Sequence, residues 1–297
     1  MSRALFYIVK WKKIRLVHTM RDYYLMCPQS SMYKNSQSCE EICTACKPFA
    51  AIRKHAAKRV DVFLSNSQFV QDRHDHHNMF PDNATKHSQY NMNAAGEMSQ
   101  PRERDPAKPL RFGFIGNLIP TKGVDVLIKA CNQLDADNWT LKIAGKGAES
   151  YVASLKEIAN PHVEFIGWAD SASFYKDVDI LICPSTYHDP LPRVIYEAYK
   201  AGLPVIASDT GGNPEIIEHG TTGFTYPAYD VEALATYLQK CLDMPPKEYK
   251  TLSTATLKKA QLFEPEKILR ADLWIRDLAS EGKLAGAGVV IINPPFT

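Results

Sequence analysis

The chain has 297 residues, of which 45% are hydrophobic and 23% charged, with a formal net charge of +2 at pH 7. This composition is typical of a globular protein of about two domains. No uninterrupted apolar run approaches the roughly 18 residues of a membrane span. The apolar stretch ALFYIV near the start is too short for a signal peptide. We therefore expect a cytoplasmic protein.

Charge is distributed unevenly along the chain. Residues 1–110 hold 17 Lys and Arg against 10 Asp and Glu, whereas residues 111–297 hold 18 against 23. The basic first part is suited to an anionic acceptor or a membrane surface, and scattered solvated charge explains the same excess. The basic residues form no dense cluster and no nucleic-acid-reading motif, which excludes nucleic acid as the expected partner.

Residues 1–108 predict a partial domain with a linker. The elements expected in it are strands at 14–20 and 61–67 and a basic helix at 47–59. The tract from Asp72 to Pro109 is rich in His, Asn, Gln and Pro and predicts loops, in which His74, His76 and His77 would be solvated. Two strands do not complete a domain, and no glycine-rich turn precedes them. The opening βαβ part of a Rossmann-like domain is therefore expected to be missing.

Four of the seven cysteines are close together in the sequence. Cys27, Cys39, Cys43 and Cys46 have the spacing C-x11-C-x3-C-x2-C, and the last three are close to the spacing of structural zinc ligands. Free cysteines are the other interpretation. The odd total without an export signal argues against a disulfide framework.

Residues 109–262 alternate short apolar runs with helical patterns, as a parallel α/β sheet requires. We expect strands at 111–116, 140–145, 162–167, 179–185, 204–208 and 222–226, and helices near 122–134, 149–159, 171–177, 193–202, 213–219 and 230–243. Strands this apolar are covered by helices on both faces. The prediction is a doubly wound, Rossmann-like domain that binds its ligand at the carboxyl ends of the strands.

Glycine-marked turns follow three of these strands. They contain Gly116 with Lys122 shortly after it, Gly145, and Gly212. A lysine at a helix start on this edge attracts phosphate, and a solvated surface charge is the alternative. The GKG turn at 145–147 does not match the dinucleotide-binding fingerprint. The third glycine and the downstream acidic residue of that fingerprint are not found at the required spacing.

The stretch CPSTYHDPLPRVIYEAYKAG places two carboxylates eight positions apart. Asp189 lies in a loop, and Glu197 lies in the second turn of a helix that starts at about Pro192. An anion at the free amides between them would have a carboxylate on either side to accept hydrogen bonds from hydroxyls. A diphosphate flanked by a sugar and a ribose has this chemistry. A capping aspartate and a surface glutamate are the alternative.

A family resemblance covers residues 110–226. The motifs FGFIGNLIPTKGVD, IAGKGAE, DILICPSTYHDPLPRVIYEAYKAGLPVIAS and DTGGNPEIIEHGTTGF resemble, in order, the donor domain of the retaining nucleotide-sugar glycosyltransferases of family 4. LVHTMRDYYLMCP and DVFLSNSQFVQDRH resemble the later part of that family's acceptor-side domain. The resemblance implies a GT-B fold of two Rossmann-like domains with parallel sheets, the N-terminal one incomplete. It also implies transfer from a UDP-, GDP- or ADP-sugar without a catalytic metal or other cofactor.

The resemblance assigns roles to individual residues. Glu197 matches the acid that binds the ribose, and Lys122 the lysine that neutralises the diphosphate. Asp189 stands where the family has a glutamate near the reacting centre, and it is one methylene shorter. Asn117 replaces an arginine. The implied donor-binding set is Gly116, Asn117, Lys122, Gly145, Pro190, Leu191, Pro192, Arg193, Glu197 and Gly212, with Asp189, Glu197 and Lys122 as the catalytic residues.

The first domain departs from the family's pattern. His18 and Asp22 are kept, but Arg21 stands where a related subset has histidine, and the family's opening strands are absent. We therefore expect an N-terminally truncated member. Residues 263–279 predict an amphipathic helix. The resemblance implies that this helix packs back toward the first domain, as the last helix of GT-B enzymes does. The apolar run in the tail at 282–297 predicts an edge strand or an unrelated extension.

The predicted function is retaining transfer of a sugar to a glycan or lipid-linked acceptor in polysaccharide or glycoconjugate synthesis, with peripheral association at the membrane. Two alternatives stay open. One is a catalytically incompetent, donor-binding remnant, since a fold and a half-site do not make an enzyme. The other is a sugar-nucleotide epimerase, against which the spacing of the paired acids argues.

Overall fold

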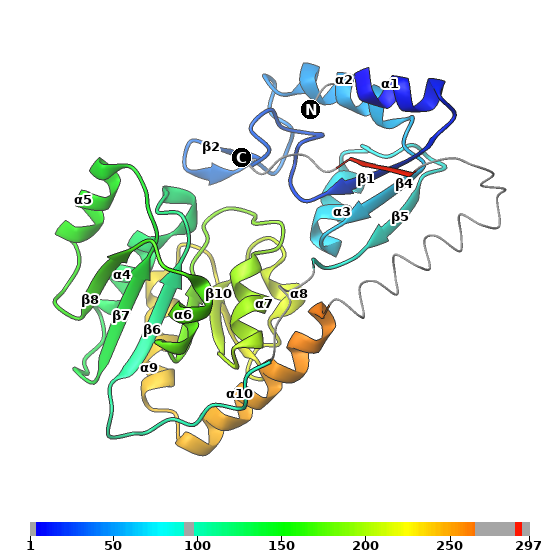
Figure 1. Cartoon of the computed structure of the whole chain (residues 1–297). Helices are drawn as coiled ribbons and strands as arrows, with labels where there is room; N and C mark the ends of the chain where they lie inside the picture. The colour runs from blue at the N-terminus through cyan, green and yellow to red at the C-terminus, as the bar shows by residue number, and fades with distance from the viewer. Residues whose placement is uncertain (1–3, 92–97, 265–288, 293–297) are drawn as a thin grey trace. The chain divides into compact units, whose positions relative to one another are not determined.

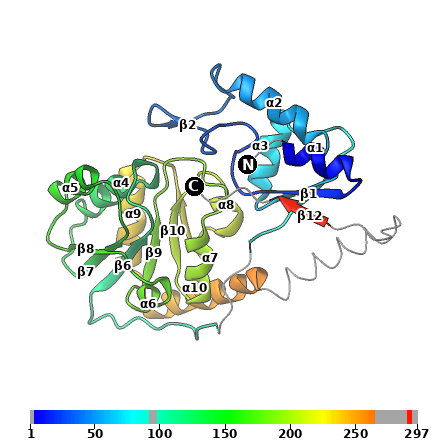
Figure 2. The same ribbon diagram turned by 45° about the horizontal axis from the view of Figure 1, so that its top comes forward.

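The computed structural model describes residues 4–91, 98–264 and 289–292 (Figures 1 and 2). The described residues form two compact units. The first consists of residues 4–91, 188–191 and 289–292, and the second of residues 98–187 and 192–264. Most of the helix expected at 263–279 lies outside the described residues.

The first unit contains a parallel sheet with the order β12-β1-β4-β5. Its elements are α1 (Ala4–Trp11), β1 (Arg15–Met20), β2 (Tyr33–Lys34), β3 (Gln37–Ser38), α2 (Lys47–Ala57), β4 (Val62–Ser65), α3 (Gln68–His76), β5 (Thr85–Ser88) and β12 (Val289–Ile292). Strands β2 and β3 form a separate short antiparallel hairpin. Strand β12 pairs with β1, with Val289 opposite Arg15. Of the two alternatives left open for the tail, the edge strand is the one that the structure shows.

The sheet of the first unit has four strands where the sequence analysis expected two. Strand β5 has the polar sequence TKHS and pairs in parallel with β4. Helix α3 begins at Ser67, whose Oγ accepts a hydrogen bond from the Val70 amide at 3.2 Å. The reading of residues 72–109 as loops was therefore wrong for α3 and β5. Polar segments of this kind form through capping and backbone pairing rather than through an apolar periodicity.

Two histidines are buried in the core of the first unit. His74 Nδ1 donates to the Val70 carbonyl at 2.7 Å, and the ring stacks between Tyr23 and Phe80. Burial lowers the pKa of His74 to about 4, and burial lowers the pKa of His18 to about 3. The expectation of a solvated His74 was wrong, because the aromatic side chains of the unit enclose its ring.

The second unit is a six-stranded parallel sheet with the order β11-β10-β9-β6-β7-β8. The strands are β6 (Leu110–Ile115), β7 (Trp139–Ala144), β8 (Val163–Gly167), β9 (Ile180–Cys183), β10 (Val205–Ser208) and β11 (Gly223–Tyr226). The helices are η1 (Pro120–Lys122), α4 (Val124–Cys131), α5 (Glu149–Glu157), α6 (Ser171–Lys176), α7 (Arg193–Lys200), α8 (Asn213–Ile216), α9 (Val231–Leu242), α10 (Pro246–Ala260) and η2 (Gln261–Phe263). Each strand expected from the sequence is present within two residues of its predicted ends.

Helices cover both faces of this sheet. Helices α4, α5 and α9 pack together on one face, and α6, α7 and α10 lie on the other (Figures 1 and 2). The central strands are therefore apolar on both sides, with Phe112, Leu141, Ile182 and Ile206 at most 1% exposed. Full burial of such a side chain contributes about 1.5–3 kcal/mol. The predicted doubly wound architecture is confirmed.

The segment before β6 is attached to the second unit by two arginines. The guanidinium of Arg102 donates to the carbonyls of Tyr175, Val178 and Ala201. Arg104 donates to the carbonyls of Cys241 and Met244. Residues expected to form a linker thus carry specific contacts.

Strand order determines where a ligand can bind. The chain runs from β6 to β7 and β8 on one side, and then returns to place β9 on the other side of β6. The connections after β6 and β9 therefore leave the sheet in opposite directions. A crevice opens at the carboxyl ends of two such strands in doubly wound sheets, and ligands bind there.

Candidate functional site

The turn after β6 places Lys122 at this edge of the sheet. Gly116 and Asn117 follow the strand, and Lys122 ends the 3-10 turn η1. Gly123 has a φ of +65°, and a Cβ there would lie 1.9 Å from the Pro184 carbonyl oxygen. This left-handed residue separates η1 from α4. Lys122 therefore precedes α4 rather than starting it, which corrects the helix predicted from residue 122.

The turn after β6 is bonded to the loop after β9. The Thr186 amide donates to the Thr121 carbonyl at 2.9 Å, and the Thr186 hydroxyl donates to the Pro120 carbonyl at 3.3 Å. The Lys122 ammonium lies 5.1 Å from the ring centroid of Tyr187, a distance at which the cation and the ring attract each other. These contacts fix the position of the lysine relative to β9.

Helix α7 starts at the same edge. Pro192 is its N-cap, and the helix runs from Arg193 to Lys200. Pro192 thus stands just before the first turn, one position earlier than the sequence analysis expected. The open amides and the positive dipole end of the first turn favour an anion. Arg193, exposed in that turn, adds a full positive charge.

The carboxylate of Glu197 is oriented from two sides. Arg193 Nη2 donates to Oε1 at 2.8 Å, and the Tyr175 hydroxyl donates to Oε2 at 3.2 Å. Burial and the charge of Glu197 raise the pKa of Tyr175 well above its ordinary value, so this hydroxyl remains a donor. The Arg193 side chain is 60% exposed and that of Glu197 is 17% exposed. Because water reaches the Arg193 guanidinium and screens its charge, a ligand can replace this contact.

Glycines allow the loops at this edge to approach one another. Gly145 has a φ of +151°, and a Cβ there would lie 1.8 Å from the Gly116 carbonyl oxygen. Gly212 is the N-cap of α8, with an ordinary φ of −83°, and Gly211 before it has a φ of +64°. The Ser208 hydroxyl after β10 donates to the Ser185 carbonyl at 2.6 Å. The ends of β6, β7, β9 and β10 are therefore tied into one edge.

The remaining predicted donor residues belong to the first unit. They are Asp189, Pro190 and Leu191 in the segment 188–191. All three are buried, with Asp189 6% exposed. The Ser67 hydroxyl donates to the Pro190 carbonyl at 2.7 Å. The Tyr23 hydroxyl donates to the carbonyl of His188 at 2.5 Å. The backbone on either side of Asp189 is thus held by residues of the first unit.

The structure adds residues that the sequence analysis did not single out. Tyr175 contacts Glu197, Tyr187 contacts Lys122, and Thr186 joins the loops after β6 and β9. Thr186 and Tyr187 lie in the same loop as Asp189. Their position in the sequence could therefore have marked them as site residues. Tyr175 lies on α6, 22 positions before Glu197 in the sequence, and nothing in the pattern connects the two.

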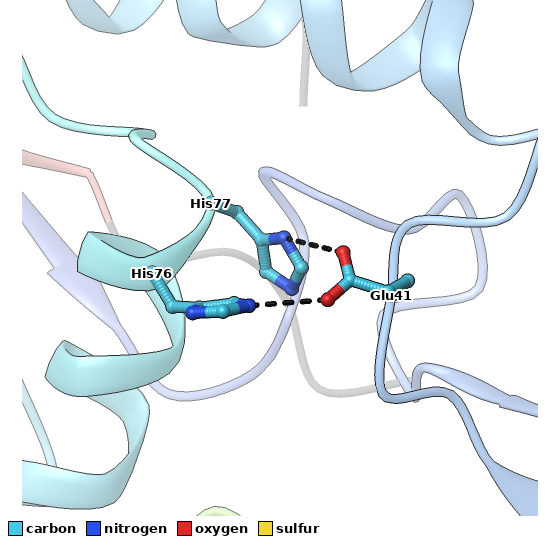
Figure 3. A group of neighbouring side chains, drawn as sticks. All are labelled: Glu41, His76 and His77. Carbon is cyan, nitrogen blue, oxygen red and sulfur yellow. Dashed lines mark hydrogen bonds and ion pairs between the residues drawn. The ribbon is translucent and has the colours of Figure 1, made fainter.

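A cluster of possible metal ligands lies in the first unit (Figure 3). Within the described ranges, Glu41, His76 and His77 form one group of three whose ligand atoms lie within 4.8 Å of one another. His76 Nε2 lies 3.1 Å from Glu41 Oε1, and His77 Nδ1 lies 3.7 Å from Oε2. The hydrogen bond from His76 lowers the pKa of Glu41. The contacts join the loop that carries Glu41 to the end of α3.

Two surface cavities of the second unit lie elsewhere. One of about 720 Å³ is lined by residues of α9 and by Gln133, Met244 and Pro245. The other, of about 420 Å³, lies at the amino ends of the strands, beside Arg111 and Asp179. We place the candidate site at the carboxyl edge instead, because that edge combines the switch in strand order with Lys122, Arg193 and Glu197.

Comparisons with known proteins identify a family for most of the second unit. Residues 97–259 match the family model of glycosyl transferases group 1. The chain belongs to the glycosyl transferases group 1. One relative is the uncharacterized 42.6 kDa protein in the cps region of Klebsiella pneumoniae. It is 32% identical to this chain, and the matched segment covers 72% of this chain and 56% of the relative. Another is the amylovoran biosynthesis glycosyltransferase AmsK of Erwinia amylovora, 31% identical over 44% of this chain and 35% of the relative.

Solved structures show the same fold as the group 1 chain. Anabaena HepE, solved in complex with UDP, has a TM-score of 0.76 and 20% identity, over 94% of this chain and 76% of HepE. The predicted α/β fold of the GT-B type, with parallel sheets, is confirmed. The chain spans about half or less of the length of the two curated relatives. Among the described residues, no helix has the length and apolar character to cross a bilayer.

Proposed function

We propose that the second unit binds a nucleoside-diphosphate sugar at its carboxyl edge and that the chain transfers the sugar, with retention of configuration, to a glycan or lipid-linked acceptor. One observation carries the proposal. Lys122 and Glu197 follow β6 and β9, the two neighbouring strands at which the sheet order reverses. The HepE structure with UDP, and the biosynthetic role in the name of AmsK, support the substrate class and the setting.

The polar groups at the edge match the parts of such a donor. Lys122, Arg193 and the first amides of α7 supply positive charge for the diphosphate. These groups, rather than a metal ion, stabilise the leaving nucleotide as the glycosidic bond breaks. Asn117 adds no charge at this edge. The Glu197 carboxylate accepts hydrogen bonds from the two ribose hydroxyls, and Tyr175 holds it in place. Asp189 keeps in this proposal the role that the resemblance implies.

Removing the Glu197 carboxylate tests the donor site. In calorimetric titrations with UDP, GDP, ADP and their sugar conjugates, we expect the wild-type chain to bind one nucleotide. Glu197→Ala should weaken this binding by about 100-fold, because two hydrogen bonds to a charged group are lost. Glu157→Ala, which removes an exposed acid on α5, should leave the affinity unchanged.

The same titration separates the alternatives. Equal affinity of wild type and Glu197→Ala would exclude this ribose site. Binding that depends on Glu197 but is followed by no transfer and no hydrolysis of the sugar nucleotide would favour a donor-binding protein without catalysis. Conversion of the sugar nucleotide to its epimer would favour the epimerase alternative.

A basic, aromatic surface of the first unit supports a membrane location for the acceptor. Helices α1 and α2 lie next to each other (Figure 1). Residues 4–15 and 47–59 contain nine Lys and Arg and neither Asp nor Glu. Five large apolar side chains of these helices are exposed: Tyr7, Ile8, Trp11, Phe49 and Ile52. Arg59 lies 3.8 Å from the centre of the Tyr7 ring and joins the two helices. We propose that this surface binds the anionic face of a membrane.

Vesicle binding tests this surface. We expect the chain to bind vesicles that contain phosphatidylglycerol and not vesicles of phosphatidylcholine alone, with affinity falling as salt is added. Combining Lys12→Gln and Lys13→Gln should weaken binding about 30-fold, since each cation near the surface contributes about 1 kcal/mol. Trp11→Ala should weaken it further, because Trp11 is 77% exposed. The matched pair Lys247→Gln and Lys258→Gln, exposed on α10, should have no effect, and an equal loss in both pairs would exclude the proposed surface.

A further inference from the structure

Residues 27–46 of the first unit have little regular structure to hold them. Their described secondary structure is the hairpin of β2 and β3, which has two residues in each strand. Four residues of the segment, Ser30, Met32, Asn35 and Ser36, have a positive φ without being glycine, which costs free energy. Met32 is buried, whereas most of the segment is polar or exposed. A segment with so small an apolar core usually needs a cross-link or a metal ion to be ordered.

The four cysteines of this segment lie close to one another in space, as well as in the sequence. The Cys43 and Cys46 sulfurs are 3.0 Å apart. Cys46 also has a hydrogen bond with Cys27, and Cys39 interacts electrostatically with Cys43 and Cys27. These interactions therefore link all four thiols, with Cys43 and Cys46 in direct contact. Among the described residues, no three of the sulfurs all lie within 4.8 Å of one another, so a shared ion would draw the outer sulfurs inward.

The distance between Cys43 and Cys46 is intermediate between two bonded states. A disulfide would require about 2.05 Å. Zn–S bonds of about 2.3 Å in a tetrahedron place the sulfurs about 3.8 Å apart. Zinc thus requires the pair to open by less than an ångström. The backbone around the pair is the tight turn of a C-x2-C ligand pair, with the Cys46 amide donating to the Cys43 carbonyl at 2.8 Å.

Positive charge lies around the cysteines. Cys46 is the N-cap of α2, and the N-terminal end of a helix dipole favours negative charge. The positive charges of Lys34 and Arg73 act on Cys39. Zinc with four thiolates has a net charge of −2, which these two cations compensate in part.

We propose that Cys27, Cys39, Cys43 and Cys46 bind one structural zinc ion, which orders residues 27–46. All four positions around the ion are occupied by protein sulfur, so the site has no open position for catalysis. The ordered segment in turn contacts the residue before Asp189. The Ser38 hydroxyl oxygen accepts a hydrogen bond from the His188 amide at 3.1 Å, and Glu40 lies 3.5 Å from His188 Nε2. The zinc ion thus supports the backbone that carries Asp189.

The group of Glu41, His76 and His77 is the weaker candidate for the ion. It offers three ligand atoms, and the side chains of Glu41 and His76 are 74% and 61% exposed. The positive charge of the nearby Arg73 contributes to lowering the pKa of His77, after burial. The same guanidinium would repel a divalent cation. We therefore use this group as the control.

Metal analysis of the full chain, produced without a histidine tag, tests the proposal. After dialysis, we expect inductively coupled plasma mass spectrometry to find about one zinc ion per chain. Titration with a mercurial thiol reagent should release the zinc as about four thiols react. Cys43→Ser and Cys46→Ser should each lose the zinc, whereas Cys241→Ser and His76→Ala should keep it. Replacement of zinc by Co²⁺ in the wild-type chain should produce the absorption of sulfur-to-cobalt charge transfer, so the test does not depend on the folding of a variant.

Three results would overturn the proposal. The first is a chain without zinc whose seven thiols all react as free cysteines. The second is an intact mass lowered by two hydrogens for each disulfide among the four cysteines. The third is zinc that is lost in His76→Ala and kept in Cys43→Ser. None of these measurements involves nucleotide binding or sugar transfer, so failure here would leave the proposed function unaffected.

Discussion

Lys122→Met should reduce the rate of sugar transfer, or of sugar-nucleotide hydrolysis, by about 100- to 1,000-fold. This magnitude is typical of the loss of one preorganised group that stabilises charge developing in the transition state. Methionine keeps most of the length and the apolar stem of lysine, so the packing on Tyr187 changes little. Affinity for the intact donor should fall less than the rate, because the negative charge on the leaving diphosphate is greatest as the glycosidic bond breaks.

Lys129→Met is the matched control for this charge. Lys129 lies on the exposed side of α4 and pairs with Asp125 one turn away, at 3.0 Å. Such a pair contributes at most about 0.5 kcal/mol to stability. We expect the rate and the nucleotide affinity of Lys129→Met to equal those of the wild type. A Lys122→Met chain that retains the wild-type rate and affinity would remove Lys122 from the site.

The second unit was predictable from the sequence because its strands are apolar on both faces. Runs such as RFGFIG and DILICPS can only be central strands of a covered sheet, and the helices between them have matching apolar sides. The order of the strands in the sheet was not predicted from the sequence. The periodicity of apolar residues shows whether a strand is buried, but it does not show which strands lie beside it. That order places the turn with Lys122 next to the start of α7, so the site depends on information beyond local pattern.

The first unit was predicted less well because polar sequence forms part of its regular structure. Helix α3 has the sequence QFVQDRHDH, in which the Ser67 cap was the usable signal. His74 looked solvated in that tract, but the aromatic rings of Tyr23 and Phe80 enclose it. Strand β12 comes from the far end of the chain and pairs with β1. A parallel pairing of segments more than 270 positions apart has no local signature.

The candidate site was predicted in its composition and not in its local geometry. Lys122, Arg193 and Glu197 were identified as donor contacts, and those roles stay predictions. Gly123 separates Lys122 from α4 by a left-handed residue, and Tyr175 reaches Glu197 from a different helix. The implied donor-binding set includes Gly145, and that role stays a prediction. The structure shows that Gly145 lies close to the backbone of Gly116, which leads to a further expectation for its substitution.

Gly145→Ala should destabilise the second unit by about 3 kcal/mol or more. A Cβ at this position would lie 1.8 Å from the Gly116 carbonyl oxygen, and a φ of +151° is strained for alanine. The overlap can be relieved only by moving apart the ends of β6 and β7. Those ends are joined by the Gly116 amide, which donates to the Ala144 carbonyl at 3.0 Å, and by the Leu118 amide, which donates to the Lys146 carbonyl at 2.8 Å.

Urea unfolding followed by tryptophan fluorescence, to which Trp139 buried in β7 contributes, measures this effect, with Gly220→Ala as the control. Gly220 also has a positive φ, +77°, but nothing lies within 4 Å of a Cβ there. Its substitution should cost only the backbone strain of about 1–2 kcal/mol.

Equal losses of stability in the two variants would show that backbone strain, and not the contact with Gly116, determines the cost. A Gly145→Ala chain of wild-type stability that no longer binds nucleotide would instead assign Gly145 to the ligand, as the resemblance implied. A large loss of stability confined to Gly145→Ala is the expected outcome, because a carbonyl oxygen held by its strand cannot move away from the added carbon without breaking the hydrogen bonds beside it.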